Sequence, residues 1–369
     1  MEKIQDESLI SREASLAIKG LLIFLIILGH NSFFSSESRI GMVFLYTFHI
    51  QAFFILPFLY PHKKVSVIRL RNYIIRFYYP FVIFFLFLSL LNHIGNTWGI
   101  IPENTFSGNI GTVNKWKEFL LTIITGNGYC IDYFTGFQFL WFLPVMFSMV
   151  ILKDIYYDKR ANYMLRYFMV LFGCIFFLIY FIFGFRTPFD KNIIYLLKEY
   201  SPFAITYALG AFFMGVISLR VIKMEKYRSA NIVIPALFVS GAILCFVSQH
   251  DGKVPIDDEI RWILLLVMPF LFFFIIYQLR DYLSKITLLK DIGKYSFPIY
   301  IIHPFLLKVF FMIVYPLWGA NWLIVIVSQV IITAISYYIA LIIYNNHYLK
   351  AIMFPSNWNE LSNLKFTKK

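Results

Sequence analysis

The chain has 369 residues, of which 60% are hydrophobic, 20% aromatic and only 14% charged. A soluble domain of this size carries about a quarter charged residues, so the composition excludes an ordinary soluble protein. The net charge of +13 suggests nucleic-acid binding at first, but its distribution along the chain follows a membrane topology instead.

Apolar runs near twenty residues long predict an all-α polytopic membrane protein with about ten transmembrane helices. The first run is too long for the apolar core of a signal peptide and lacks a small-residue cleavage pattern, so we expect it to remain as a helix. The cysteines show no spacing typical of a disulfide framework or a metal site. The expected spans lie at about 15–34, 41–60, 73–92, 139–157, 165–185, 201–219, 231–249, 260–278, 295–315 and 321–344.

The distribution of Lys and Arg sets the expected orientation. With a cytoplasmic N-terminus, the inner segments hold 23 Lys and Arg and the outer loops hold 8, as the positive-inside rule predicts. We therefore expect both ends in the cytoplasm. The predicted organisation is an N-terminal segment 1–13, a transmembrane domain 14–345 with an outer connection at about 93–138, and a tail 346–369.

The first expected span, "SLAIKGLLIFLIILGHNSFF" (15–34), carries Lys19 near one end and His30 near the other. Eleven residues make about three helical turns plus 20°, so the two side chains share a face, about 16 Å apart along the axis. Ionisable groups in a bilayer usually face a cavity or a partner. A lysine that snorkels to lipid phosphate and an interfacial histidine are the alternative interpretation.

His49 lies on the second span in "YTFHIQAFF", at a depth similar to that of His30. A hairpin of about six residues, 35–40, joins the two spans, so we expect these helices to be neighbours. Two histidines at one depth can handle protons near neutral pH. A histidine bonded to a backbone carbonyl explains His49 equally well.

His303 lies on the ninth span in "YSFPIYIIHPF", between two prolines that disturb the helix. Tyr300 and Ser296 precede it by three and seven residues and form a polar stripe on an apolar helix. A structural polar cluster and a direct chemical role both fit this pattern.

Five basic residues occur in "HKKVSVIRLRNYIIRFYYP" (62–80), just before the third span. The positive-inside rule accounts for the two lysines. Arg76 reaches the start of the apolar run, where a bidentate grip on phosphate is plausible chemistry for a guanidinium, with Arg69 or Arg71 assisting.

Five segments, in order along the chain, resemble motifs of the membrane acyltransferase-3 family. "IKGLLIFLIILGH" resembles its first-helix motif, a basic residue and Gly before an apolar run that ends in His, and "FHIQAFFILPFLY" resembles its second-helix pattern. "RFYYP" (76–80) is similar to its Arg-x-x-x-Pro entry to the third helix. "LWFLPVMF" (140–147), which contains Trp141, and "IGKYSFPIYIIHPFL" (292–306) are similar to two later segments. Lys19 stands where many members carry Arg.

The resemblance covers about residues 14–345. It implies transfer of an acyl group, commonly acetyl, from cytoplasmic acyl-CoA to a hydroxyl on an extracytoplasmic glycan or lipid-linked sugar. It points to His30 as the catalytic residue and to the first-helix basic residue as needed for activity. It further implies a multi-pass protein of the bacterial inner or plasma membrane that uses acetyl-CoA and no metal. We expect no nucleic-acid partner, and an oligomer is left open.

A mechanism follows from combining the spacing with the resemblance. Lys19 and Arg76, assisted by Arg69 or Arg71, would hold the phosphates of coenzyme A at the cytoplasmic mouth while the arm reaches His30.

His30 would then deprotonate an acceptor hydroxyl, which attacks the thioester, while His49 or Tyr300 stabilises the oxyanion or reorients His30. Supporting roles are expected for Trp141, Ser296 and His303. A carrier or exporter of a polysaccharide or lipid-linked sugar without acyl chemistry is the rival function. Dependence on an acyl donor separates the two.

Overall fold

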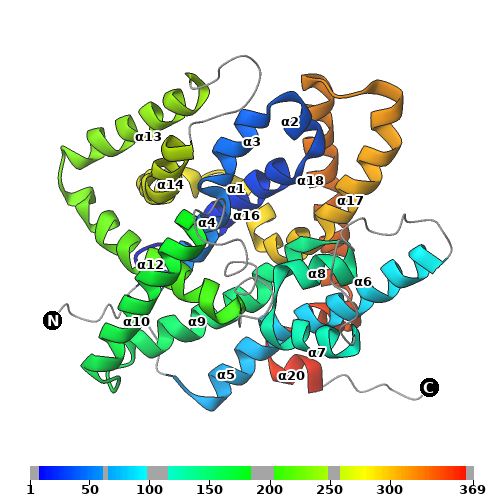
Figure 1. The fold of residues 1–369 in the computed structure, drawn as a ribbon, viewed down its shortest axis with the longest axis horizontal. Helices are drawn as coiled ribbons and strands as arrows, with labels where there is room; N and C mark the ends of the chain where they lie inside the picture. Colours follow the sequence, from blue (N-terminus) through cyan, green and yellow to red (C-terminus); the bar gives the residue numbers. More distant parts are fainter. Residues whose placement is uncertain (1–7, 61–64, 98–114, 184–202, 248–257, 363–369) are drawn as a thin grey trace. The chain divides into compact units, whose positions relative to one another are not determined.

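Every regular element in the described part of the chain is helical (Figure 1). Eight helical segments in that part are long and apolar enough to cross a membrane, and two shorter apolar ones, Ala230–Cys245 and Leu266–Gln278, bring the set to the predicted ten. The prediction of an all-α polytopic membrane protein is therefore confirmed. The computed structural model describes residues 8–60, 65–97, 115–183, 203–247 and 258–362.

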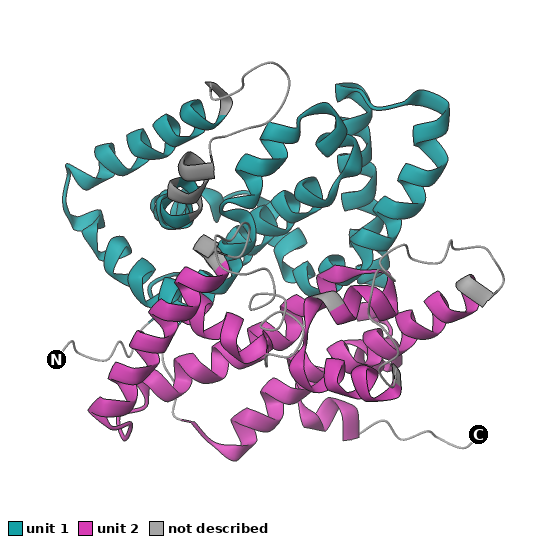
Figure 2. Cartoon of the chain, in the orientation of Figure 1, with its two compact units in different colours: residues 1–61, 213–342 teal, residues 62–212, 343–369 magenta. Residues whose placement is uncertain are grey.

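The chain forms two compact units, and each unit is assembled from two separate stretches of sequence (Figure 2). Unit 1 contains residues 1–61 and 213–342, and unit 2 contains residues 62–212 and 343–369. The first helices of the chain therefore pack against helices that come much later in the sequence. The predicted outer connection, 93–138, and both predicted end segments lie partly outside the described residues.

The helices of unit 1 account for six predicted spans, for part of the sixth span (201–219), and for the amphipathic segment between the eighth and ninth spans. Helix α12 passes from unit 2 into unit 1, and α18 passes back into unit 2. The helices are α1 (Arg12–His30), α2 (Ser32–Glu37), α3 (Arg39–Tyr46), α4 (His49–Ile55), α12 (Phe203–Ile222), α13 (Ala230–Val247), α14 (Asp258–Gln278), α15 (Arg280–Leu283), α16 (Thr287–Lys294), α17 (Ser296–Trp318) and α18 (Trp322–Asn345).

The first span ends earlier than predicted. Helix α1 stops at His30 because Asn31 adopts an extended conformation and its side chain caps α2, accepting a hydrogen bond from the backbone N–H of Phe33 at 3.1 Å. Residues 35–37, predicted as part of a loop, are helical. Asn31 therefore fixes the position of His30 at the end of α1.

The second span is broken, although a continuous helix over 41–60 was expected. The backbone N–H groups of Thr47 and Phe48 bond to the carbonyls of Phe44 and Leu45, three residues back instead of four. The hydroxyl of Thr47 also donates to the Phe44 carbonyl, at 2.6 Å. The break leaves Tyr46 as the last residue of α3 and His49 as the first residue of α4.

Helices α1 and α16 pack backbone against backbone through two glycines. A Cβ atom on Gly20 would overlap the carbonyl oxygen of Leu289, and a Cβ atom on Gly293 would overlap that of Leu16. Such a close approach is available only where no side chain intervenes. Both glycines belong to the segments that resemble family motifs. The packing of α1 against α16 therefore explains why these two motif positions are glycine.

Unit 2 contains three of the long apolar segments and the first part of a fourth, Phe203–Lys226. The described part of the connection at 93–138 includes two further helices, α7 and α8. The third span begins at Val67 instead of 73, so Arg69 and Arg71 lie on its first turns. The helices are α5 (Val67–Tyr73), α6 (Tyr79–Thr97), α7 (Lys115–Thr125), α8 (Gly128–Thr135), α9 (Phe142–Tyr157), α10 (Tyr163–Phe177), α19 (His347–Met353) and α20 (Trp358–Ser362).

A π-helical turn, Ile74–Tyr78, separates α5 from α6 and contains Arg76. Pro80 has no N–H to give to the carbonyl four residues back, which is that of Arg76. The helix widens here, and the N–H of Tyr79 bonds to Ile74, five residues back. The four-residue spacing of Arg-x-x-x-Pro is thus the spacing between a proline and the carbonyl that it leaves unbonded.

Candidate acyl-transfer site

Three predicted site histidines come together at the His30 end of α1. The ring centroids of His30 and His303 are 5.5 Å apart. His49 packs against Gly29, where a Cβ atom would lie 2.9 Å from its Nε2 atom, so the glycine allows α4 to approach α1. The side chains of these three histidines and of Tyr46, which is described below, are together called the histidine cluster.

His49 and His303 share one hydrogen-bonding arrangement. The Nδ1 atom of each lies close to the carbonyl oxygen four residues back, at 2.6 Å from Leu45 and 3.0 Å from Ile299. A carbonyl oxygen can only accept, so each Nδ1 carries the proton and each neutral ring has a lone pair on Nε2. Both rings are fully buried, and neither Nε2 atom has a hydrogen-bond partner.

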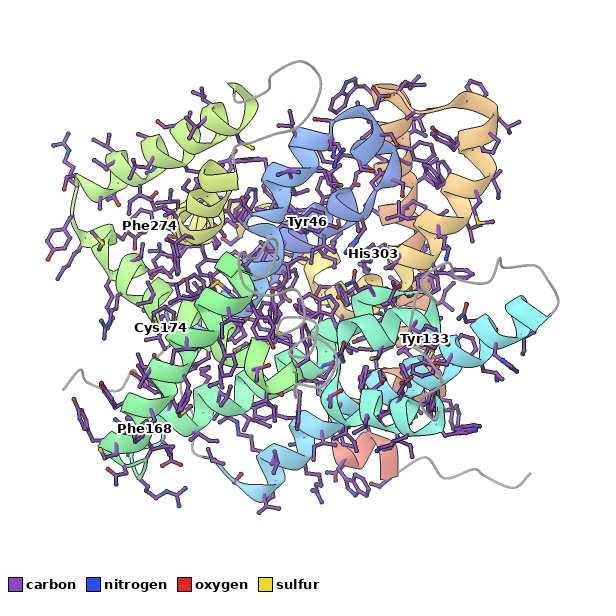
Figure 3. The ribbon with its side chains drawn as sticks, viewed as in Figure 1. Tyr46, Tyr133, Phe168, Cys174, Phe274 and His303 are labelled. Atoms are coloured by element: carbon purple, nitrogen blue, oxygen red, sulfur yellow. The ribbon has the colours of Figure 1, made fainter. Side chains whose placement is uncertain are left out.

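Tyr46 is a member of the cluster that the sequence did not reveal. Its hydroxyl lies 3.4 Å from Nδ1 of His30, and its ring packs edge-on against His49 with centroids 4.7 Å apart. Figure 3 labels Tyr46 on α3 and His303 on α17, which come from opposite ends of the sequence. The sequence feature that could have pointed to Tyr46 is its position three residues before His49.

The break in the second span explains how this geometry arises. Leu45 would normally bond to the N–H four residues later, but the tightened turn redirects its carbonyl to the N–H of Phe48 and to the ring of His49. The side chain of His49 thereby replaces a helix hydrogen bond. The interpretation of His49 as a carbonyl-bonded histidine is correct for Nδ1, while its Nε2 atom remains available for chemistry.

Lys19 lies towards the opposite end of α1, as predicted. Its ammonium group is 5.6 Å from the ring centroid of Tyr60, just beyond the end of the second span. The hydroxyl of Tyr60 also bonds to that of Ser15, one helical turn before Lys19. The first two spans therefore meet at both levels, at Tyr60 near Lys19 and at Tyr46 near His30.

Tyr300 and Ser296 are separated along α17. Tyr300 is buried beside His303, with ring centroids 5.9 Å apart. Ser296 is the first residue of α17, about 10 Å along the helix axis from His303. Tyr300 is therefore adjacent to the histidine cluster, whereas Ser296 is not part of it.

The three predicted arginines lie in unit 2 and differ in their surroundings. Arg69 is bound to the buried carboxylate of Asp154 at 2.9 Å and to the hydroxyl of Tyr73 at 2.6 Å. Arg71 is exposed and lies over the ring of Trp358, 5.6 Å from its centroid, while Arg76 is exposed on the π-helical turn. The sequence did not reveal Asp154, which neutralises Arg69.

Trp141 also lies in unit 2, in a 3-10 turn, Gln138–Trp141, that leads into α9. Its ring packs edge-on against Tyr207 at 4.9 Å and Phe203 at 6.0 Å between centroids. These contacts give the tryptophan a packing role in the aromatic core of unit 2. Its supporting role in the reaction stays a prediction.

The fold and the site together define an integral membrane protein with three histidines, two of them buried, gathered at one end of its first span. The model of a family described as an acyltransferase domain matches residues 16–343. The chain belongs to this acyltransferase-3 family and is a membrane acyltransferase. Neither the curated proteins nor the solved structures compared with it gave a match.

Proposed function

We propose that the protein transfers an acetyl group from cytoplasmic acetyl-CoA to a hydroxyl of an extracytoplasmic glycan or lipid-linked sugar. The observation that carries the proposal is the arrangement along α1, with Lys19 towards one end and the histidine cluster at the other. The two are about 16 Å apart along the helix axis, a distance that suits a long, thin coenzyme arm with a charged head.

His30 acts as the general base in this proposal. We assign the proton of the neutral ring to Nδ1, facing the Tyr46 hydroxyl 3.4 Å away. The lone pair on Nε2 is then left to take the proton of the acceptor hydroxyl. The acceptor oxygen bonds to the thioester carbonyl carbon, and the carbon–sulfur bond breaks as the tetrahedral intermediate collapses. The proton held by His30 then passes to the leaving thiolate, which restores the base.

The oxyanion of that intermediate needs a hydrogen-bond donor. Neutral His49 and His303 present lone pairs at Nε2, so neither can supply one without first gaining a proton. Tyr300, buried beside His303, carries a hydroxyl that can donate, and we assign the oxyanion contact to it. His49 and His303 then serve as acceptors that keep the acceptor hydroxyl or a relayed proton near His30.

The phosphates of the donor require cationic partners. Lys19 is the cation on α1 that the proposal assigns to them, and it provides a point charge where many family members have a guanidinium fork. Arg71 and Arg76 are further candidates, to be tested by their own substitutions. Arg69 is already neutralised by Asp154, so its main task is to hold α5 against α9.

Surface glycan from wild-type and deletion cells tests the function directly. O-acetyl signals in the NMR spectrum should be present in the wild type, absent in the deletion strain and restored by the intact gene. Loss of the glycan itself from the surface, with acetylation of the internal pool unchanged, would instead support the exporter. The expected bacterial inner or plasma membrane location is checked by fractionating the same cells.

A further inference from the structure

Helix α18 carries polar side chains that the histidine cluster does not use. Gln329, Thr333 and Ser336 follow one another at four- and three-residue spacing, so they lie on one helix face. They are 4%, 8% and 0% exposed. Oε1 of Gln329, Oγ1 of Thr333 and Oγ of Ser336 have no hydrogen-bond partner. These three residues are called the α18 stripe.

Unpaired oxygen atoms on a membrane helix are costly because no bulk water reaches them. Ser and Thr in helices usually donate to the carbonyl four residues back, as Thr122 and Ser148 do in unit 2. The two hydroxyls of the α18 stripe leave that bond unmade. They are therefore available to a polar molecule that enters unit 1.

The α18 stripe begins near the histidine end of α1. The side chain of Asn31, next to His30, donates to the hydroxyl of Ser328 at 2.8 Å. Gln329 follows, and its Nε2 atom donates to the carbonyl of Phe24 at 3.0 Å. The face of α18 that bears the stripe is thus turned towards α1.

The stripe ends near the lysine end of α1. Tyr337, the neighbour of Ser336, packs against Tyr295 with ring centroids 5.6 Å apart. Tyr295 follows Gly293 by two residues, and Gly293 contacts α1 at Gly20, next to Lys19. The α18 stripe therefore covers the same stretch of α1 that separates Lys19 from His30.

We propose that the α18 stripe binds the amide-bearing arm of the acyl donor, the pantetheine portion of coenzyme A, an inference that rests on the proposed function. Successive amides in this arm are about 5 Å apart, one carbon more than the 3.8 Å repeat of a peptide. Gln329 and Thr333 are about 6 Å apart along α18. Oε1 of Gln329 accepts from one amide N–H, and the hydroxyls of Thr333 and Ser336 bond to the other amide.

The chemistry of the stripe favours this occupant over a plain acyl chain. A hydrocarbon chain offers no group that can satisfy an oxygen atom, whereas the pantetheine arm offers both N–H donors and carbonyl acceptors. The arm is also uncharged, which suits a stripe without an ionisable side chain. Its phosphate-bearing end would lie towards Lys19 and its thioester towards His30.

Binding of two probes to the purified full-length protein tests the inference. Acetyl-CoA carries the arm, whereas adenosine 3′,5′-bisphosphate carries phosphates without it. In the double variant Thr333→Val, Ser336→Ala, the Kd for acetyl-CoA should rise by about 2- to 10-fold for each hydrogen bond lost. The Kd for the bisphosphate should not change. The matched control is Thr125→Val, Ser148→Ala in unit 2, where both hydroxyls already bond within their own helices.

The possible results are distinct. An unchanged Kd for acetyl-CoA in the stripe variant, or an equal rise for both probes, would overturn the inference and leave the proposed function standing. A wild-type protein that binds neither probe would overturn the proposed function as well. The stripe variant should unfold at or above the wild-type temperature because it removes unsatisfied polar atoms. Measuring that temperature distinguishes weaker donor binding from misfolding.

Discussion

The imidazole rings of His30 and His303 lie 5.5 Å apart, although they come from the first and ninth predicted spans. The two glycines that precede them by ten residues, Gly20 and Gly293, sit at the contact between α1 and α16. The two segments thus make contact at both ends of a ten-residue interval. Contact at the glycines sets the level at which the histidines meet.

Replacing His30 tests its role as the general base. His30→Gln keeps a polar side chain of similar size but cannot take the proton, so kcat should fall by about 10²- to 10⁴-fold. Transfer of radiolabelled acetyl from acetyl-CoA measures it, and His93→Gln on α6 is the control. Activity near the wild-type level in a correctly folded His30→Gln protein would remove His30 from the mechanism.

Tyr46 is expected to position His30 without touching the donor. Tyr46→Phe removes the hydroxyl 3.4 Å from Nδ1 of His30 and should lower kcat by about 2- to 10-fold. The KM for acetyl-CoA should stay constant, whereas a general loosening of the fold would change it. The exposed Tyr282→Phe change serves as control, and a shift in KM alone would contradict the positioning role.

The glycine contact between α1 and α16 predicts a marked sensitivity to one added methyl group. Gly20→Ala and Gly293→Ala each place a Cβ atom where a backbone oxygen of the neighbouring helix already lies. Each should destabilise the protein by about 1–3 kcal/mol and lower its unfolding temperature. In Gly128→Ala the new Cβ atom meets Trp141 no closer than 3.4 Å, so this control should unfold like the wild type.

The ion pair between Arg69 and Asp154 should stabilise unit 2. Asp154→Asn leaves a guanidinium that is only 20% exposed without its carboxylate. We expect a loss of about 2–3 kcal/mol in stability, the cost of leaving a largely buried polar group without its partner. Glu13→Gln, in which the carboxylate is 68% exposed, should change stability by less than about 1 kcal/mol. Equal unfolding temperatures for the two variants would show that the buried pair contributes nothing.

Substitutions at Lys19 separate charge from geometry in donor binding. Lys19→Ala should raise the Kd for acetyl-CoA by roughly 10-fold or more, the effect of losing a charged hydrogen bond, whereas Lys19→Arg should keep binding and activity. Lys308→Ala, which removes an exposed lysine from α17, is the control. Unaltered donor binding in Lys19→Ala would assign Lys19 to lipid phosphate instead.

Much of this organisation was predictable from the sequence. Hydropathy located all ten apolar segments. In lipid, a spanning segment must satisfy its backbone hydrogen bonds within one helix, so each span is a long continuous apolar run in the sequence. Helical periodicity placed Lys19 and His30 on one helix, and depth along the chain placed His49 near His30. The proximity of His30 and His303 was predictable only through the family motifs, because no local feature of either segment indicates that it packs against the other.

Other features depended on tertiary context. The break at Thr47 and Phe48 contains neither Pro nor Gly, so the usual signals of a helix end were missing, and Tyr46 went unnoticed with it. Asp154 lies in an apolar run far from Arg69 in the sequence, and only the fold shows that they pair. The π-helical turn at Arg76, by contrast, has a local cause in Pro80.

Unit 1 is discontinuous, and this bears on how the protein is made. Helix α1 leaves the ribosome early, whereas α16 and α17 follow only after the 62–212 stretch of unit 2. Throughout that interval the newly inserted α1 holds a lysine and a histidine in the bilayer without its later partners, and the backbone at Gly20 is not yet covered by α16. A nascent chain that stops before Gly293 therefore leaves its first helix without the backbone contact that α16 supplies in the complete fold.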